Sequence, residues 1–308
     1  MDESSPIRSM AEFNTCEICG NGDWKVIYQG NIRDGSIGWF RKNVIIAECR
    51  PCLIQRLNEE NSLPLEKYQD TTYAQSVAGI RSVMDARRGQ HHLYEFMALA
   101  LGAGLERLRN KTVVDVGCGA GVWFDFCGEI AGEVIGVEPN REFRQFLQNE
   151  GRTIYNDLES AIEERGGEVD WVISSQVIEH VESPKCFLNE IRQLLKPGGE
   201  AMISTPNRND ILMASVPGFE KFFFRTQHRW YFDKESLENC VQHAGFDIVE
   251  LKFIHRYGVS NFLNWLEKGR PDGIVRNVGI SSRVDSLWAK YLQTTGQADN
   301  IFCHLKRT

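Results

Sequence analysis

Four of the nine cysteines form two CxxC pairs near the start of the chain, Cys16 with Cys19 and Cys49 with Cys52. Each pair closes a tight turn that can direct both thiolates at one ion, and four thiolates complete the tetrahedron that zinc prefers. A redox pair of the thioredoxin type needs a strand-to-helix context, which neither pair has. Four cysteines leave no open coordination position for a substrate, so the spacing predicts a structural zinc ion.

A glycine-rich turn stands at VVDVGCGAG, where an apolar run ends and a helical pattern begins. Glycines let the backbone approach a ligand closely, and the N-terminus of the following helix offers amide donors. Further along the chain, VIGVEP ends in an acid that can accept both hydroxyls of a ribose. The pattern predicts a nucleotide-binding site formed by Asp115, Gly117, Cys118, Gly119, Gly121, Glu138 and Pro139.

The elements that must position these residues alternate between strand and helix patterns from Lys111 onward. Such alternation predicts an α/β fold, with a doubly wound, mostly parallel sheet between two layers of helices. Before it, the runs WKVIYQG and NVIIAEC suit strands of a small hairpin-rich module. We expect a zinc-binding module at 1–60, a helical linker at 61–108 and a cofactor-binding domain at 109–308, with insertions at about 206–232 and 255–298.

The motif D-x-G-x-G-x-G followed by V-E-P resembles the class I S-adenosylmethionine-dependent methyltransferases and not the dinucleotide dehydrogenases. YNDL, VDWVISSQVIEHV and LLKPGGEAMIS extend the resemblance over roughly residues 90–254. The resemblance implies a Rossmann-like sheet of seven strands with an antiparallel last strand, which NIFCHLKRT would supply. It also implies that Asp157 contacts the adenine, and we place Gln176 with the residues that bind S-adenosylmethionine.

The acceptor site is expected where the fourth strand ends, at QVIEH. If a helical turn begins at Gln176, Gln176 and Glu179 share a face and approach the adjacent His180. QVIEHV, STPN and the later TQHRWYF are similar to the small-RNA 2′-O-methyltransferases and the ubiquinone-biosynthesis O-methyltransferases. In the former, E-x-x-E-H and a later His hold a divalent ion. Glu179, His180 and His228 match that set by position, whereas Gln176 replaces the first acid.

Three interpretations of this acceptor motif remain open. A divalent ion such as magnesium or manganese would lower the pKa of an acceptor hydroxyl and fix its direction. The loss of one acid at Gln176 would weaken such an ion's binding. Alternatively, His180 or His228 is a general base without metal. In the third interpretation the Glu-His pair caps a helix or orients the substrate.

Aromatic and basic residues gather in the two insertions. Aromatic faces with Arg and Asn side chains suit sugars or anionic groups such as a pyrophosphate, although the same residues could form the core of a cap. Phe222, Phe223 and Phe224 are expected in that core. The candidate substrate-binding residues are Arg208, Arg225, Arg229, His255, Arg256, Tyr257 and Asn261.

The net charge of −7 disfavours a nucleic-acid partner, because proteins that bind the phosphate backbone of a nucleic acid normally carry an excess of basic residues. The chain lacks an apolar run of the roughly 18 residues that a membrane span needs, and its start lacks the pattern of a signal peptide. We therefore expect a cytoplasmic protein with no membrane partner.

Together these patterns predict a methyltransferase that acts on a hydroxyl of a sugar, glycan, nucleotide sugar or related small molecule, as in bacterial surface-polysaccharide or secondary-metabolite pathways, which the whole chain resembles. Three alternatives remain: a C-methyltransferase on a keto sugar, with a His as base; an RNA 2′-O-methyltransferase; and a binding module without catalysis.

Overall fold

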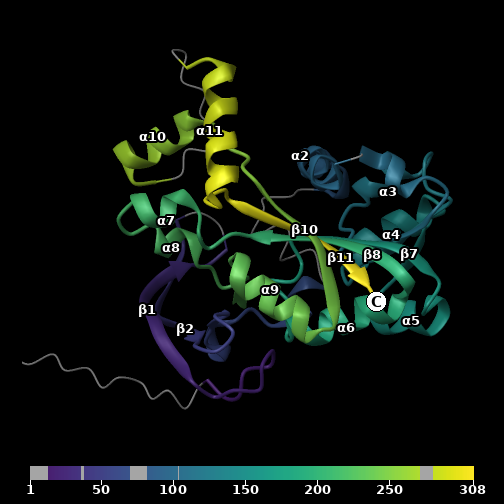
Figure 1. The fold of residues 1–308 in the computed structure, drawn as a ribbon, viewed down its shortest axis with the longest axis horizontal. Helices are drawn as coiled ribbons and strands as arrows, with labels where there is room; N and C mark the ends of the chain where they lie inside the picture. Colours follow the sequence, from purple (N-terminus) through teal and green to yellow (C-terminus); the bar gives the residue numbers. More distant parts are fainter. Residues whose placement is uncertain (1–12, 36–37, 70–81, 103, 271–279) are drawn as a thin grey trace, which may run out of the picture.

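The computed structural model describes residues 13–35, 38–69, 82–102, 104–270 and 280–308, and leaves the side chains of 90–96 undescribed (Figure 1). Its larger sheet has seven strands in the order β10-β11-β8-β7-β4-β5-β6. Only β11 runs antiparallel to its neighbours, β8 and β10, which confirms the expected last strand. The strands are β4 (Thr112–Val116), β5 (Glu133–Val137), β6 (Thr153–Tyr155), β7 (Val169–Ser175), β8 (Leu195–Pro206), β10 (Phe246–Ile254) and β11 (Asn300–Arg307).

Helices cover both faces of this sheet, as the strand-helix alternation predicts (Figure 1). The central strands β4 and β7 are buried along nearly their whole length, which explains why they read as continuous apolar runs. One face carries α2 (Val83–Leu101), α3 (Val122–Cys127) and α4 (Arg141–Asn149). The other carries α5 (Leu158–Arg165), α6 (Pro184–Leu194) and α9 (Lys234–His243).

A smaller sheet of four strands contains the predicted N-terminal hairpin, β1 (Trp24–Arg33) with β2 (Phe40–Cys49). It continues through β3 (Gln55–Leu57) to β9 (Trp230–Tyr231), which comes from the insertion after β8. Trp230 is fully buried, and its indole donates to the carbonyl of Val181, beyond the end of β7. One continuous hydrophobic core therefore joins the cysteine-bearing module to the larger sheet.

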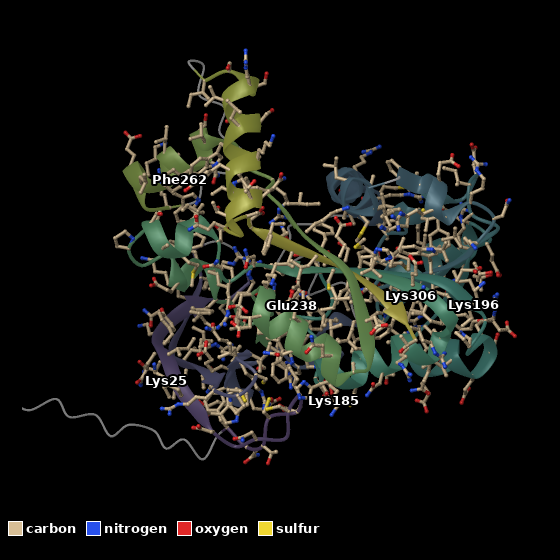
Figure 2. The ribbon with its side chains drawn as sticks, in the orientation of Figure 1. Lys25, Lys185, Lys196, Glu238, Phe262 and Lys306 are labelled. Carbon is tan, nitrogen blue, oxygen red and sulfur yellow. The ribbon has the colours of Figure 1, made fainter. Side chains whose placement is uncertain are left out.

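The insertions lie at the carboxyl end of the parallel strands, near the module. They form α7 (Ile211–Ser215) and α8 (Glu220–Phe223) before β9, and α10 (Val259–Lys268) and α11 (Ser282–Thr295) before β11. Figure 2 shows Phe262 on α10 and Lys25 on β1 at one end of the molecule, and Lys196 and Lys306 at the other end. Short 3-10 helices precede β4: η2 (Glu59–Asn61), η3 (Leu65–Tyr68) and η4 (Gly104–Leu108).

Several aromatic residues of the first insertion pack in a second core that they share with β1, β2 and α10. Phe223 and Phe224 are buried, and the rings of Phe219 and Phe222 both meet Trp265 of α10 edge-on. This confirms the core interpretation for those phenylalanines. Within the described ranges, no helix combines the length and apolar character needed to cross a membrane.

Candidate active site and cysteine cluster

The four cysteines of the CxxC pairs converge at one end of the smaller sheet. The Sγ atoms of Cys16 and Cys52 are 3.6 Å apart, and those of Cys19 and Cys49 are 3.5 Å apart. All four ligand atoms lie within 4.8 Å of one another. Sulfurs bound to one zinc ion at about 2.3 Å in a tetrahedron are separated by about 3.8 Å. The arrangement therefore fits a tetrahedral four-thiolate site.

The turns that follow the two cysteine pairs are built alike. The amide of Gly20 donates to the carbonyl of Cys16, and the amide of Leu53 donates to the carbonyl of Cys49. Both donors adopt the left-handed conformation, with φ of 74° at Gly20 and 60° at Leu53. A leucine pays a steric cost in that conformation, so the second turn is held by its surroundings.

The glycine-rich turn connects β4 to α3 at the carboxyl end of the sheet. Gly117, Gly119 and Gly121 all have positive φ, at 76°, 53° and 76°. A Cβ at Gly117 would lie 2.4 Å from Cγ2 of Val177, and one at Gly121 would lie 2.3 Å from Cδ2 of Leu147. Both conformation and space therefore favour glycine at these positions. The amides of Gly117 and Cys118 donate to the carbonyl of Val137, and that of Gly121 donates to the carbonyl of Cys118.

Glu138 lies across from this turn and is buried. Its Oε2 accepts the amide of Gly119 at 2.7 Å and its Oε1 accepts the amide of Asn140 at 2.7 Å. Burial nevertheless raises the pKa of Glu138 to about 7. Burial, together with the negative charge of Glu138, raises the pKa of Asp115 well above its ordinary value. Cys118 is buried in the same turn, whereas Pro139 offers its carbonyl to Arg144.

Two further residues predicted to bind the cofactor also have structural partners. Oδ1 of Asp157 accepts the amide of Ser160 and so caps α5. Gln176 has φ of 58°, and its amide nitrogen donates to Ser204 and Asn300. The expectation of a helical turn beginning at Gln176 is wrong, because its left-handed backbone breaks the helical path; the turn begins at Val177, whose carbonyl accepts the amide of His180.

The structure brings Glu179, His180 and His228 together beyond the end of β7, with their ligand atoms all within 4.8 Å of one another. The Nε2 of His180 is 3.9 Å from Oε1 of Glu179, and the two imidazole rings meet edge-on at 4.9 Å. Glu179 is 1% exposed. Its Oε2 accepts Thr205 Oγ1 at 3.1 Å, whereas its Oε1 is buried without a hydrogen-bond partner among the described residues.

The hydrogen bonds of His180 fix its tautomer. Its Nδ1 is 2.7 Å from the carbonyl oxygen of Gln227, which can only accept, so Nδ1 carries the proton. Nε2 then presents a lone pair toward Glu179. The hydroxyl of Tyr68 donates to the same carbonyl at 2.8 Å and lies 3.0 Å from Nδ1. This is the orientation that metal-binding histidines and general bases both require.

Burial dominates the electrostatics of this cluster. It lowers the pKa of His180 to about 4 and that of His228 well below its ordinary value, with the charge of Arg225 acting in the same direction on both. Burial raises the pKa of Glu179 to about 7. Two neutral imidazoles and one carboxyl group thus face one point, from which they can hold a divalent cation or remove a proton.

Most of the predicted substrate-binding arginines are already engaged. Arg208 pairs with Glu48 and Asp233, Arg229 pairs with Glu59, and Arg256 pairs with Asp299. His255 is buried beside Asp299, the guanidinium of Arg256 lies over the ring of Tyr257, and Asn261 is buried in α10. Of the predicted arginines only Arg225 forms no ion pair within the described residues.

The sequence did not predict that three further side chains lie near the acceptor cluster: Tyr68, Thr205 and Arg33. Tyr68 ends η3 in a polar segment without a recognisable motif. Thr205 stands next to the proline of STPN, inside a strand pattern, and Arg33 ends β1. Only their positions in three dimensions reveal them.

Comparisons with known proteins agree with this geometry. Residues 89–251, more than half of the chain, match a family model described as a methyltransferase domain. The mitochondrial ubiquinone biosynthesis O-methyltransferase of Mus musculus is 27% identical over 176 residues, which are 52% of this chain and 48% of that protein. The ubiquinone biosynthesis O-methyltransferase of Roseobacter denitrificans is 29% identical over 53% of this chain and 69% of that protein.

The match thus spans about half the length of the mouse relative. Among solved structures, an S-adenosylmethionine-dependent methyltransferase from Archaeoglobus fulgidus aligns with a TM-score of 0.47 at 19% identity, over 70% of this chain and 94% of that one. The family match, the seven-stranded sheet and the glycine-rich turn lead to one conclusion: the chain belongs to the family of class I S-adenosylmethionine-dependent methyltransferase domains.

Proposed function

We propose that this methyltransferase transfers the methyl group of S-adenosylmethionine to a hydroxyl of a polar small molecule, such as a sugar or nucleotide sugar, with help from a divalent ion. The cluster of Glu179, His180 and His228 carries the proposal. There, a buried carboxylate oxygen that has no hydrogen-bond partner among the described residues faces a histidine lone pair. The similarity to two ubiquinone biosynthesis O-methyltransferases supports a hydroxyl acceptor.

The residues of the acceptor cluster fit a divalent ion. Oε1 of Glu179 is buried and has no partner in the described part of the chain, which costs free energy that a bound cation would offset. Two imidazoles and one carboxylate occupy three coordination positions and leave the others for the acceptor. The bound ion would lower the pKa of the acceptor hydroxyl. Gln176 is directed at Ser204 and Asn300, so we propose a three-residue site without it.

The remaining residues would position the two reactants. Methyl transfer is an in-line displacement, so the acceptor oxygen must approach the methyl carbon opposite the sulfonium sulfur. The glycine-rich turn would let the cofactor approach the backbone closely, and Glu138 would accept the ribose hydroxyls. Tyr68 and Gln227 hold His180 in place. At the other end of the module, we propose that the four cysteines bind a structural zinc ion.

The proposed function is tested with the purified full chain after treatment with a chelator, with its zinc content followed by elemental analysis. Formation of S-adenosylhomocysteine is measured on addition of a small-molecule extract from cells lacking the gene, and mass spectrometry identifies the molecule that gains a methyl group. We expect turnover that depends on re-added Mn²⁺ or Mg²⁺. Full turnover without any divalent ion would overturn metal assistance and assign proton removal to a histidine.

Cofactor affinity should depend on pH through Glu138. Its pKa is about 7 in the ligand-free protein, so a ribose hydroxyl can donate to its ionised form mainly above that pH. Affinity for S-adenosylhomocysteine, measured by calorimetry, should rise with pH by up to about tenfold per unit below the pKa and level off above it. Glu138→Gln should weaken binding and flatten the profile. Glu133→Gln, at the start of β5 and paired with Arg165, should keep the wild-type profile.

The same shift predicts how the ligand-free protein responds to pH. The folded pKa of Glu138 is higher than its ordinary value, so its contribution to stability is fully present below the ordinary value of 4.5 and is lost as pH rises through about 7. A melting temperature whose pH dependence is the same in Glu138→Gln and in the wild type would contradict this assignment.

Tyr68→Phe should weaken divalent-ion binding without unfolding the protein. The substitution removes only the hydroxyl that lies 3.0 Å from Nδ1 of His180, so the ring loses part of its orientation. Partners of metal-binding histidines typically affect affinity by about 10–100-fold, and we expect about tenfold weaker Mn²⁺ binding by electron paramagnetic resonance. Tyr155→Phe, which removes a surface hydroxyl bonded to Glu164, is the control. Equal Mn²⁺ affinities in the two variants would refute the role of Tyr68.

A further inference from the structure

Two arginines from distant parts of the chain stand side by side where the cysteine-bearing module meets the first insertion. Arg33 ends β1, and Arg225 lies between α8 and β9. The amide of Arg33 donates to the carbonyl of Phe224 at 3.1 Å, and the amide of Thr226 donates to the carbonyl of Arg33 at 3.0 Å. These hydrogen bonds hold both backbones in register, as one rung of a parallel bridge.

The backbone of Arg225 is also tied directly to the acceptor cluster. Its amide donates to the hydroxyl of Tyr231, which in turn donates to the carbonyl of Arg225, both at 3.0 Å. The same carbonyl accepts the amide of His228 at 3.1 Å. Arg225 therefore stands at a defined position beside the proposed metal-binding residues.

The side chain of Arg225 differs from the other candidate arginines in its partners. Arg208, Arg229 and Arg256 each have carboxylates within ion-pair distance, whereas Arg225 has none among the described residues. The side chain is half-buried, and its Nε is buried with no hydrogen-bond partner in the described ranges. Such a guanidinium keeps a fork of donors available for an anion.

The charges of the two arginines act on each other. Burial, and next the charge of Arg33, lower the pKa of Arg225 to about 10, and both charges act on His228 as well. Glu179 is close enough to interact with Arg225 electrostatically, but its carboxylate is bonded to Thr205 and forms no ion pair with this arginine. Two like charges held near each other in a partly buried place favour the binding of a group of opposite charge.

We propose that Arg225 and Arg33 clamp an anionic group of the methyl acceptor, a phosphate or a carboxylate, while the neighbouring cluster holds its hydroxyl. The inference rests on the proposed function and narrows its substrate class to acceptors that carry such a group. It also gives the cysteine-bearing module a direct part in substrate recognition, since Arg33 belongs to β1. A purely structural pair would instead serve only to join β1 to the first insertion.

The test measures anion binding to the full chain by calorimetry at low ionic strength, with inorganic phosphate, pyrophosphate and malonate as separate probes. Wild-type protein should bind either a phosphate probe or malonate, which identifies the group, and added salt should weaken that binding. Arg225→Gln and Arg33→Gln should each weaken it by about tenfold or more, because each removes a charged hydrogen-bond donor. Arg41→Gln, an exposed arginine of β2 paired with Asp34, should leave it unchanged.

Absence of binding to all three probes, or equal binding in the wild type and both variants, would overturn the clamp. If circular dichroism shows that either glutamine variant is unfolded, Arg225→Lys and Arg33→Lys are used in its place. Each lysine variant should keep the positive charge but bind the anion more weakly, because lysine lacks the two parallel donors of the guanidinium. Anion binding requires neither turnover nor a metal ion. A failed clamp therefore leaves methyl transfer and Mn²⁺ binding intact, whereas a failed proposed function removes those two and leaves anion binding intact.

Discussion

Glu179→Gln should abolish divalent-ion binding and lower the rate of methyl transfer by about 10²–10⁴-fold, the loss expected when a metal's several kcal/mol of stabilisation are removed. The reason is that the carboxylate supplies the only formal negative charge of the three proposed ligands. Mn²⁺ binding is followed by electron paramagnetic resonance and turnover by formation of S-adenosylhomocysteine with the acceptor-containing extract.

The fold should survive this substitution. Glutamine has nearly the same shape, and it removes a buried carboxylate whose Oε1 has no hydrogen-bond partner in the described structure. The melting temperature should therefore be unchanged or higher. Glu182→Gln, three residues further on and exposed, is the matched control and should behave as the wild type. Wild-type turnover in Glu179→Gln, or an equal loss in Glu182→Gln, would refute the assignment of Glu179 as a ligand.

Cys49→Ser should release zinc and destabilise the region around it. Structural zinc sites in small modules contribute about 10–16 kcal/mol of apparent binding free energy, and a lost thiolate removes much of it. A loss of several kcal/mol would lower the melting temperature by roughly 10 °C or more in a chain of this size. Elemental analysis should give close to one zinc per wild-type chain and much less in the variant. Cys186→Ser, at an exposed cysteine outside the cluster, should change neither quantity.

The effect should extend to the acceptor site. Cys49 ends β2, which pairs with β3, and β3 pairs with β9, two residues from His228. Arg229, next to His228, pairs with Glu59 just after β3. We therefore expect weaker Mn²⁺ binding in Cys49→Ser as well, measured at a temperature where the larger sheet remains folded. Unchanged zinc content and stability would contradict the four-thiolate site, and unchanged Mn²⁺ affinity would contradict its coupling to the acceptor site.

Local structures that are set by residues close together in the sequence could be predicted from the sequence. The β4–turn–α3 unit follows from an apolar run, three glycines and a helical pattern, because strand, turn and cap are all specified within a few residues. Glu138 could be placed for the same reason, since it directly follows the next strand. The convergence of the CxxC pairs was also predictable, because two thiols separated by two residues share one turn.

The acceptor site was only partly predictable. Sequence spacing could bring Glu179 beside His180, but it does not indicate the positive φ of Gln176 or the hydrogen bonds from its side chain to Ser204 and Asn300. The arginines of the first insertion also could not be told apart from the sequence. Arg208 and Arg229 resemble Arg225 in composition and neighbourhood, and only their ion pairs with Glu48, Asp233 and Glu59 remove them as free anion-binding groups.

Only the folded structure reveals the contacts that join segments far apart in the sequence. Tyr68 lies beside His180 across 112 residues of sequence, and Arg33 of β1 meets Arg225 of the first insertion through an isolated parallel bridge. Hydrophobic periodicity indicates which side of an element is buried, but it carries no information about which distant element covers that side. The chain alone therefore indicates a methyltransferase with a cysteine-bearing module. Only the tertiary packing of β9 against β3 places that module at the acceptor site.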